Sequence, residues 1–182
     1  MVYVALGLAS LAFLLALFAL RTSLGATARL DRTEAEANRA SGSADEAHER
    51  TRRLEQLVTR MAAGEAVAPE MIEEGRLYEE INAAQAKTLI EEEQPEDLFV
   101  LDVRSRGEVE SGRIASATWI PVDEVEERLS EIPSSKHVVV FCAQGGRSAA
   151  ACDLLGARGY RKLTNVVGGM SSYRGETVTG AP

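Results

Sequence analysis

Aromatic residues, cysteine and histidine are scarce in this sequence of 182 residues. Aromatic side chains make up 5% of it, so Val, Ile, Leu and Ala must supply most of the core. Two cysteines, Cys142 and Cys152, are too few for a disulfide framework. The two histidines, His48 and His137, have no further ligand at metal spacing. The sequence therefore implies neither a disulfide-stapled fold nor a metal site.

Positive charge is also in short supply, because the formal net charge is -8. Residues 1–62 carry 8 arginines and 7 acidic residues, whereas the remainder carries 12 basic and 21 acidic residues. A nucleic-acid-binding surface needs a positive footprint to neutralise phosphates. The acidic C-terminal part therefore argues against nucleic acid as a partner.

One long stretch without any charge occupies residues 2–20. As a helix it spans roughly 28 Å, which is close to the bilayer core of about 30 Å. A cleaved signal peptide has a shorter apolar run of about 7–15 residues behind a basic start, and no Lys or Arg precedes this one. The run predicts a membrane anchor over residues 1–21. The triplet Ala26-Thr27-Ala28 leaves a cleaved signal peptide as the alternative.

The basic residues nearest to the predicted anchor all follow it, and none precedes it. They are Arg21, Arg29, Arg32 and Arg39. The positively charged flank of an anchor stays in the cytoplasm. We therefore expect a single-pass membrane protein with an outside N-terminus and a cytoplasmic C-terminal domain. An exported domain in an oxidising compartment is the alternative.

A charged, alanine-rich segment over residues 22–62 is predicted to form a helical stalk. Positions spaced alternately by four and three keep an unbroken heptad register, although Ser41-Gly42-Ser43 weakens a helix midway. Only four of these positions are large: Leu30, Leu54, Val58 and Met61. Two interpretations stay open, a weak coiled coil that forms a homodimer and a solvated spacer. Residues 63–77, with Gly64 and Pro69 as breakers, are predicted to be a linker.

Residues 78–175 are predicted to form the globular domain, with a flexible tail over 176–182. Apolar runs typical of strands alternate with helical patterns through the domain. The predicted strands cover 77–81, 98–103, 118–121, 137–142 and 162–169, and the predicted helices cover 83–92, 122–130 and 147–158. This alternation predicts an α/β fold, a parallel sheet with helices on both faces.

Cys142 stands where the buried run "HVVVF" gives way to a helix, and this position predicts a reactive thiol. Ligands of open parallel sheets bind at the carboxyl ends of strands. The N–H groups at the start of the following helix form an anion nest that lowers the pKa of a thiol. Arg147 adds a donor fork for an incoming anion. The candidate site contains Cys142 and its loop, Ala143, Gln144, Gly145, Gly146, Arg147 and Ser148.

Three ordered motifs resemble those of the rhodanese family of sulfurtransferases. "CAQGGRS" fits the family's C-x-x-G-x-R-S loop. "FVLDVRSRGEVESGRIASATWIP" is similar to its D-V-R signature, and "VVGGMSSYR" is similar to its closing glycine-pair segment. The resemblance covers about residues 78–175 and implies a single rhodanese-like domain.

The resemblance also implies a chemistry. Cys142 takes up a sulfane sulfur as a persulfide and passes it to a thiophilic acceptor. Arg147 and the loop amides bind the donor, which is a small anionic sulfur compound or a protein persulfide. Asp102 and Arg104 brace the loop through charge pairing and hydrogen bonds. No metal or organic cofactor is implied, because the chemistry needs only the thiolate and its nest.

One turn departs from the family pattern. Where the family usually has His-Ile-Pro-Gly-Ala, this chain has Arg113-Ile114-Ala115-Ser116-Ala117, and Arg113 is expected to bring positive charge towards the pocket.

The alternative function is a membrane-tethered interaction or redox-sensing module that keeps the fold without significant turnover. Cysteine phosphatases of the same fold have five residues between cysteine and arginine, whereas this loop has four, so phosphatase activity is not expected. Cys152 is expected to be a packed core residue.

Overall fold

The computed structural model describes residues 32, 34–92, 94 and 96–181. Its chain divides into two compact units, residues 1–50 and residues 51–182. The predicted anchor and the alternative signal-peptide cleavage site lie outside the described residues. Within the part of the chain that is described, none of the helices combines the length and the apolar character that crossing a membrane requires.

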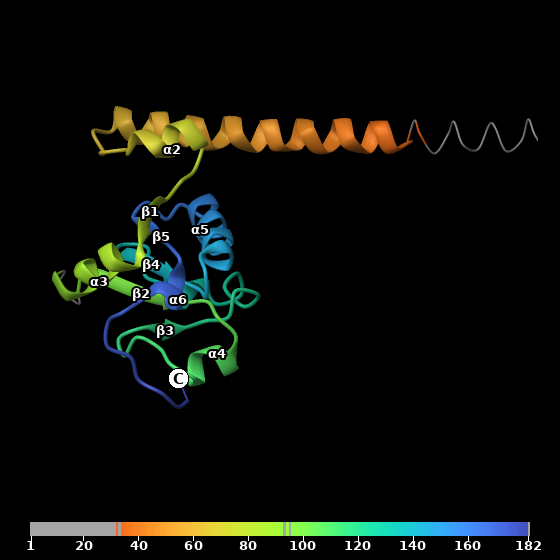
Figure 1. The fold of residues 1–182 in the computed structure, drawn as a ribbon. Helices are drawn as coiled ribbons and strands as arrows, with labels where there is room; N and C mark the ends of the chain where they lie inside the picture. The colour runs from red at the N-terminus through yellow and green to blue at the C-terminus, as the bar shows by residue number, and fades with distance from the viewer. Residues whose placement is uncertain (1–31, 33, 93, 95, 182) are drawn as a thin grey trace, which may run out of the picture. The chain divides into compact units, whose positions relative to one another are not determined.

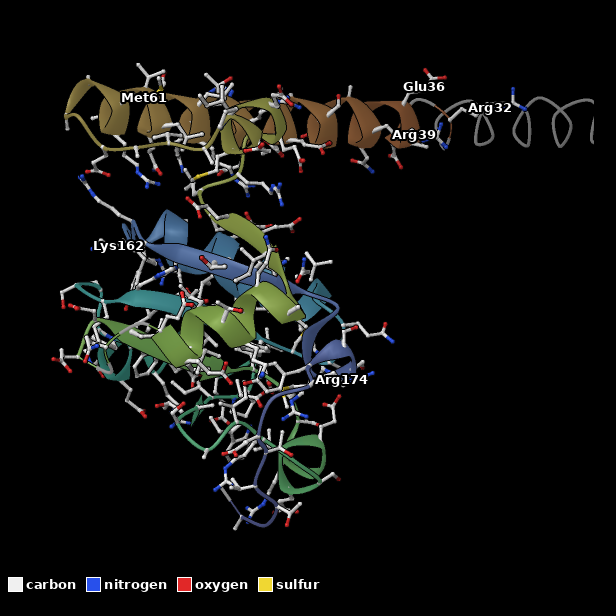
Figure 2. All side chains as sticks on the ribbon, turned by 60° about the vertical axis from the view of Figure 1, so that its left-hand side comes forward. Arg32, Glu36, Arg39, Met61, Lys162 and Arg174 are labelled. Atoms are coloured by element: carbon white, nitrogen blue, oxygen red, sulfur yellow. The ribbon has the colours of Figure 1, made fainter. Side chains whose placement is uncertain are left out.

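Residues 34–50 of the first unit are helical, through Ser41-Gly42-Ser43 as well, and so are residues 51–62 of the second unit. Residues 34–50 are exposed, and side chains such as Glu36 and Arg39 extend into solvent (Figure 2). In the second unit the heptad positions Val58 and Met61 are exposed. The homodimer stays a prediction.

The predicted linker contains a helix, α2 (Pro69–Glu74), which begins with proline and ends at Gly75 in a left-handed conformation. Met71 of this helix is buried in a small apolar cluster with Leu57 and Leu77. Leu57 lies outside the heptad register. The end of the predicted stalk and the predicted linker therefore belong to the packed structure of the second unit.

Five strands form one sheet in which every pairing is parallel, in the order β1-β5-β4-β2-β3 (Figure 1). The strands are β1 (Glu79–Asn82), β2 (Leu98–Asp102), β3 (Thr118–Trp119), β4 (His137–Phe141) and β5 (Leu163–Val167). The helical elements after α2 are α3 (Ala83–Glu92), α4 (Arg106–Glu110), the 3-10 helix η1 (Leu129–Glu131), α5 (Gly146–Ala157) and α6 (Gly169–Ser172).

Alternate residues of the central strand β4 serve two cores, one on each face of the sheet. Val138 and Val140 pack in a cluster that includes Leu155 of α5. Val139 and Phe141 pack in a second cluster with residues of α3. Helices α3 and α5 accordingly lie on opposite sides of the strands (Figure 1). The predicted parallel sheet with helices on both faces is confirmed.

The predicted helix over residues 122–130 is wrong. This segment consists of turns followed by η1, although Val125 is buried in the core. The Tyr160 hydroxyl lies 3.1 Å from the Leu129 carbonyl oxygen and 2.8 Å from that of Ile132. Backbone N–H groups in this segment bond mainly to carbonyls three residues back, as from Glu127 to Glu124 at 3.1 Å, which is the spacing of turns and 3-10 helices. The two short helices α4 and α6 were not predicted.

Candidate active site

Cys142 follows directly after β4, and α5 begins four residues later at Gly146. The turn between them depends on Gly145, whose φ is +116°, a conformation that glycine adopts without strain. Cys142 itself is 2% exposed, but the loop residues Gln144 and Gly146 above it are exposed. The thiol therefore lies just beneath the surface at the carboxyl end of the sheet.

Polar hydrogens point at the thiol. The backbone N–H of Gly145 donates to Cys142 Sγ at 3.0 Å, and Ser148 Oγ lies 3.3 Å from the same sulfur. Burial raises the pKa of Cys142, but hydrogen bonds from the Ser148 hydroxyl and from the loop amides outweigh it, so the pKa lies below its ordinary value. The thiolate is the nucleophilic form of cysteine. The arrangement favours an activated sulfur nucleophile.

A buried polar network continues from Ser148 into β5. Ser148 Oγ lies 2.6 Å from Asn165 Oδ1, and Asn165 Nδ2 donates to Glu80 Oε1 at 3.0 Å. Because a carboxylate only accepts, the amide of Asn165 must turn its NH2 group to Glu80 and its oxygen to Ser148. The Ser148 hydroxyl proton is thus shared between Asn165, the Gly145 carbonyl at 3.0 Å and the sulfur. Asn165 was not among the predicted site residues.

The glycine pair after β5 holds the loop from the other side. The N–H groups of Gly168, Met170 and Ser171 donate to the carbonyls of Gln144, Cys142 and Ala143 at 3.0, 2.9 and 3.0 Å. A Cβ on Gly169 would lie 2.2 Å from the Cys142 carbonyl oxygen. The close approach therefore requires glycine at this position.

Asp102 and Arg104 form a buried ion pair, with Arg104 Nη2 at 2.6 Å from Asp102 Oδ2. The Arg104 guanidinium also donates to the carbonyls of Glu108 at 3.1 Å and Gly112 at 2.7 Å. The predicted charge pairing is present, but these hydrogen bonds fix the segment around α4. The link from β2 towards the Cys142 loop comes from the backbone, where Val103 N–H donates to the Phe141 carbonyl.

Arg147 is paired with a carboxylate that the sequence analysis did not assign to the site. Arg147 Nη1 and Nη2 donate to Glu108 Oε2 and Oε1 at 2.9 and 2.7 Å. The signal that could have located Glu108 is the pattern S-x-x-E beginning at Ser105, because this capping box marks the start of α4.

Two further expectations, for Arg113 and for Cys152, had different outcomes. Arg113 forms a backbone bridge with Val178, and its side chain donates to the Gly180 carbonyl at 3.3 Å. These contacts hold it at the chain's C-terminal segment, part of which was predicted to be a flexible tail. Cys152 is buried in the core, as expected, and burial raises its pKa well above the ordinary value. Across the described residues, no cluster of His, Cys, Asp or Glu has the make-up of a metal site.

Comparison with known proteins identifies the family. The model of the rhodanese-like domain matches residues 82–176, just over half of the chain. A sulfurtransferase of Allochromatium vinosum is 36% identical over 78 residues, which are 43% of this chain and 73% of that protein. YtwF of Bacillus subtilis is 37% identical over 98 residues, which are 54% of this chain and 92% of that protein.

Solved structures agree with this match. The crystal structure of a rhodanese-like domain protein from Staphylococcus aureus has a TM-score of 0.52 and 29% sequence identity, and the match covers 57% of this chain and 99% of that one. The chain therefore belongs to the rhodanese-like domain family and has sulfurtransferase homologues.

Proposed function

We propose that the protein is a sulfurtransferase or sulfur carrier in which Cys142 is the sulfur-carrying residue. The observation that carries the proposal is the hydrogen bonding of its Sγ by Gly145 and Ser148 at the end of β4, which favours the thiolate. Arg147 and the amides of the loop 143–148 are proposed to receive the donor. Asp102 and Arg104 are proposed to support this loop through α4 and β2.

The proposed transfer forms one S–S bond and breaks another. With thiosulfate, the Cys142 thiolate attacks the outer sulfur, and sulfite leaves as a dianion. With a persulfide R–S–SH, the thiolate attacks the terminal sulfur, which keeps its proton, and the donor leaves as the thiolate R–S⁻. In either case a second nucleophile, the acceptor thiolate, then removes the terminal sulfur and restores the Cys142 thiolate. The loop N–H groups stabilise the negative charge on sulfur throughout.

Intact mass of the full chain in a non-ionic detergent tests this function. After incubation with thiosulfate or with a protein persulfide, Cys142 should gain one sulfur atom, which cyanide then removes. Cys142→Ser should gain none, and Cys152→Ser, the matched control, should gain it as the wild type does. A chain that gains no sulfur from either donor contradicts the proposal. That result supports the alternative, an interaction or redox-sensing module.

We also propose that residues 2–20 anchor the chain with its C-terminal domain in the cytoplasm. The charge-free run and the arginines after it support this topology. A membrane-impermeant thiol reagent applied to intact cells should label Cys142 only after the cells are opened. Labelling from outside would support the exported domain instead.

A further inference from the structure

Arg147, the cation expected to receive an anionic donor, is occupied by a carboxylate of its own chain. The two Nη atoms meet the two Oε atoms of Glu108 at 2.9 and 2.7 Å. A guanidinium binds a carboxylate ligand in this bidentate geometry. An oxyanion such as thiosulfate would need the same two guanidinium N–H groups. The side chains of Arg147 and Glu108 are 38% and 35% exposed, so a ligand from solvent can reach the pair.

The Glu108 carboxylate is held in this position by its surroundings. Ser105 donates to Oε2 through its backbone N–H at 2.9 Å and through its hydroxyl at 2.6 Å. Arg104, locked in its buried ion pair, donates to the backbone carbonyl of the same Glu108. Hydrogen bonds from Arg147 and then from Ser105 lower the pKa of Glu108 to about 2, so the carboxylate is charged at neutral pH.

The pair therefore presents no net charge beside the loop of Cys142. A donor that carries its negative charge on an oxyanion group has to displace Glu108 before that group can bind the Arg147 guanidinium. Thiosulfate is such a donor, because sulfite carries two negative charges away from the site. A persulfide donor leaves with a single negative charge, which lies on its sulfur. It therefore does not need the Arg147 guanidinium in addition to the loop N–H groups.

We propose that Glu108 is a specificity-determining residue that competes with oxyanion donors for Arg147 and thereby directs the Cys142 site towards persulfide donors. The donor preference rests on the proposed function. The competition for Arg147 does not, because any reagent that reaches the thiol reports it.

Alkylation of Cys142 by iodoacetate and iodoacetamide measures the competition directly. The two reagents have similar size and reactivity, but only iodoacetate carries a negative charge. The ratio of their rates on the Cys142 peptide of the full chain, followed by mass spectrometry, cancels changes in thiolate population. Glu108→Gln is the informative variant, because Gln preserves the capping box while it removes the charge. Glu110→Gln is its matched control on α4, where Glu110 pairs with the exposed Arg106 instead.

Glu108→Gln should raise the iodoacetate to iodoacetamide ratio by about fivefold, because one uncompensated positive charge then faces the anionic reagent. Glu110→Gln should leave the ratio within about twofold, because solvent and salt screen exposed charges. An unchanged ratio in Glu108→Gln, or an equal rise in both variants, overturns the proposal.

The wild-type chain supplies a second test that no folding defect of a variant affects. With Arg147 compensated, the thiolate repels iodoacetate and salt screens that repulsion, so the ratio should rise as salt is added. A ratio that falls with salt indicates an attractive cation beside the thiol and contradicts the proposal.

Turnover separates a failure of this inference from a failure of the proposed function. With thiosulfate as donor, Glu108→Gln should lower KM by about fivefold and change kcat by less than about twofold, the pattern of a ground-state competitor removed. With a persulfide donor that carries no oxyanion, KM should stay within about twofold. If Cys142 accepts no sulfur from any donor, the proposed function fails, and the alkylation ratio still decides whether Glu108 competes for Arg147.

Discussion

The two thiols of the chain lie in the same domain, and both are buried, yet their environments differ in kind. Cys142 stands at the end of β4, where the Gly145 amide and the Ser148 hydroxyl face its sulfur. Cys152 lies inside α5 and belongs, like Cys142, to the apolar cluster that contains Leu155 and Val138, but no hydrogen bond from a described residue reaches its sulfur. The pKa of Cys142 is lowered, whereas burial raises that of Cys152 far above the ordinary value.

The comparison separates the effect of burial on the pKa of a thiol from the effect of hydrogen-bond donors. Burial by itself disfavours the charged thiolate at both positions. At Cys142 the loop supplies hydrogen-bond donors that outweigh burial, and at Cys152 apolar packing leaves the burial effect dominant. The reactivity of a thiol in this domain therefore depends on the N–H and O–H groups that face its sulfur rather than on how deeply it is buried.

The difference between the thiols should be largest in native-state alkylation. With iodoacetamide at neutral pH, Cys142 should react about 10³-fold or more faster than Cys152, because Cys152 is exposed only when the domain opens. Peptide mass spectrometry over time gives both rates from one sample. In concentrated urea the two rates should converge, and a persistent difference there would assign the effect to local sequence rather than to the fold.

A smaller but still large effect is expected when the loop is displaced. Gly169→Ala places a Cβ against the Cys142 carbonyl and forces a non-glycine residue to φ +47°. We expect a stability loss of about 2–4 kcal/mol and a fall in Cys142 alkylation of about tenfold or more. Thermal unfolding and alkylation measure the two effects. Gly107→Ala, where nothing lies within 4 Å of the added Cβ, is the control and should neither destabilise the domain nor slow the alkylation of Cys142.

Removal of the hydroxyl donor should make Cys142 more like Cys152. The lowered pKa of Cys142 depends in part on the Ser148 side chain, so Ser148→Ala should move the pH midpoint of alkylation upwards. The alkylation rate below the midpoint falls accordingly, because less thiolate is present. Ser111→Ala, an exposed serine of α4's C-terminus, should leave the midpoint in place. An unshifted midpoint in Ser148→Ala would mean that the amides alone stabilise the thiolate.

The smallest expected effect is a downward shift of the alkylation midpoint, opposite to that of Ser148→Ala, when Asn165 is replaced. Asn165 Oδ1 draws on the single hydroxyl proton of Ser148 at 2.6 Å. Asn165→Ala releases that proton towards Cys142 and should lower the alkylation midpoint by less than Ser148→Ala raises it. The double variant with Ser148→Ala should match Ser148→Ala alone, because the effect passes through the hydroxyl. A shift that survives in the double variant would show that Asn165 acts by another route.

The parallel sheet and the loop of Cys142 could be predicted from the sequence, because local patterns determine both. The apolar run before Cys142 predicts a buried strand, and the glycines and small residues after it predict a tight turn into a helix. The start of α3 is a local feature as well, because Asn82 directly before it accepts at Oδ1 from the N–H groups of Ala84 and Gln85 at 2.9 and 3.0 Å.

What the sequence did not indicate depends on contacts between distant segments. Glu108 and Arg147 are 39 positions apart, and Asn165 reaches Ser148 across 17. No pattern along the chain pairs them until the sheet order places β2, β4 and β5 side by side. The apolar spacing of residues 122–130 suits a helix, but the segment forms turns with hydrogen bonds mainly to carbonyls three residues back, followed by η1.

The three hydrogen bonds from Gly168, Met170 and Ser171 also set an order of assembly. A ribosome makes residues 142–148 before it makes residues 168–171, so the nascent chain carries its thiol before the clamp on the loop exists. Until the closing segment leaves the exit tunnel, the carbonyls of Cys142, Ala143 and Gln144 lack these partners. The activated sulfur is thus among the last features of the domain to be completed during synthesis.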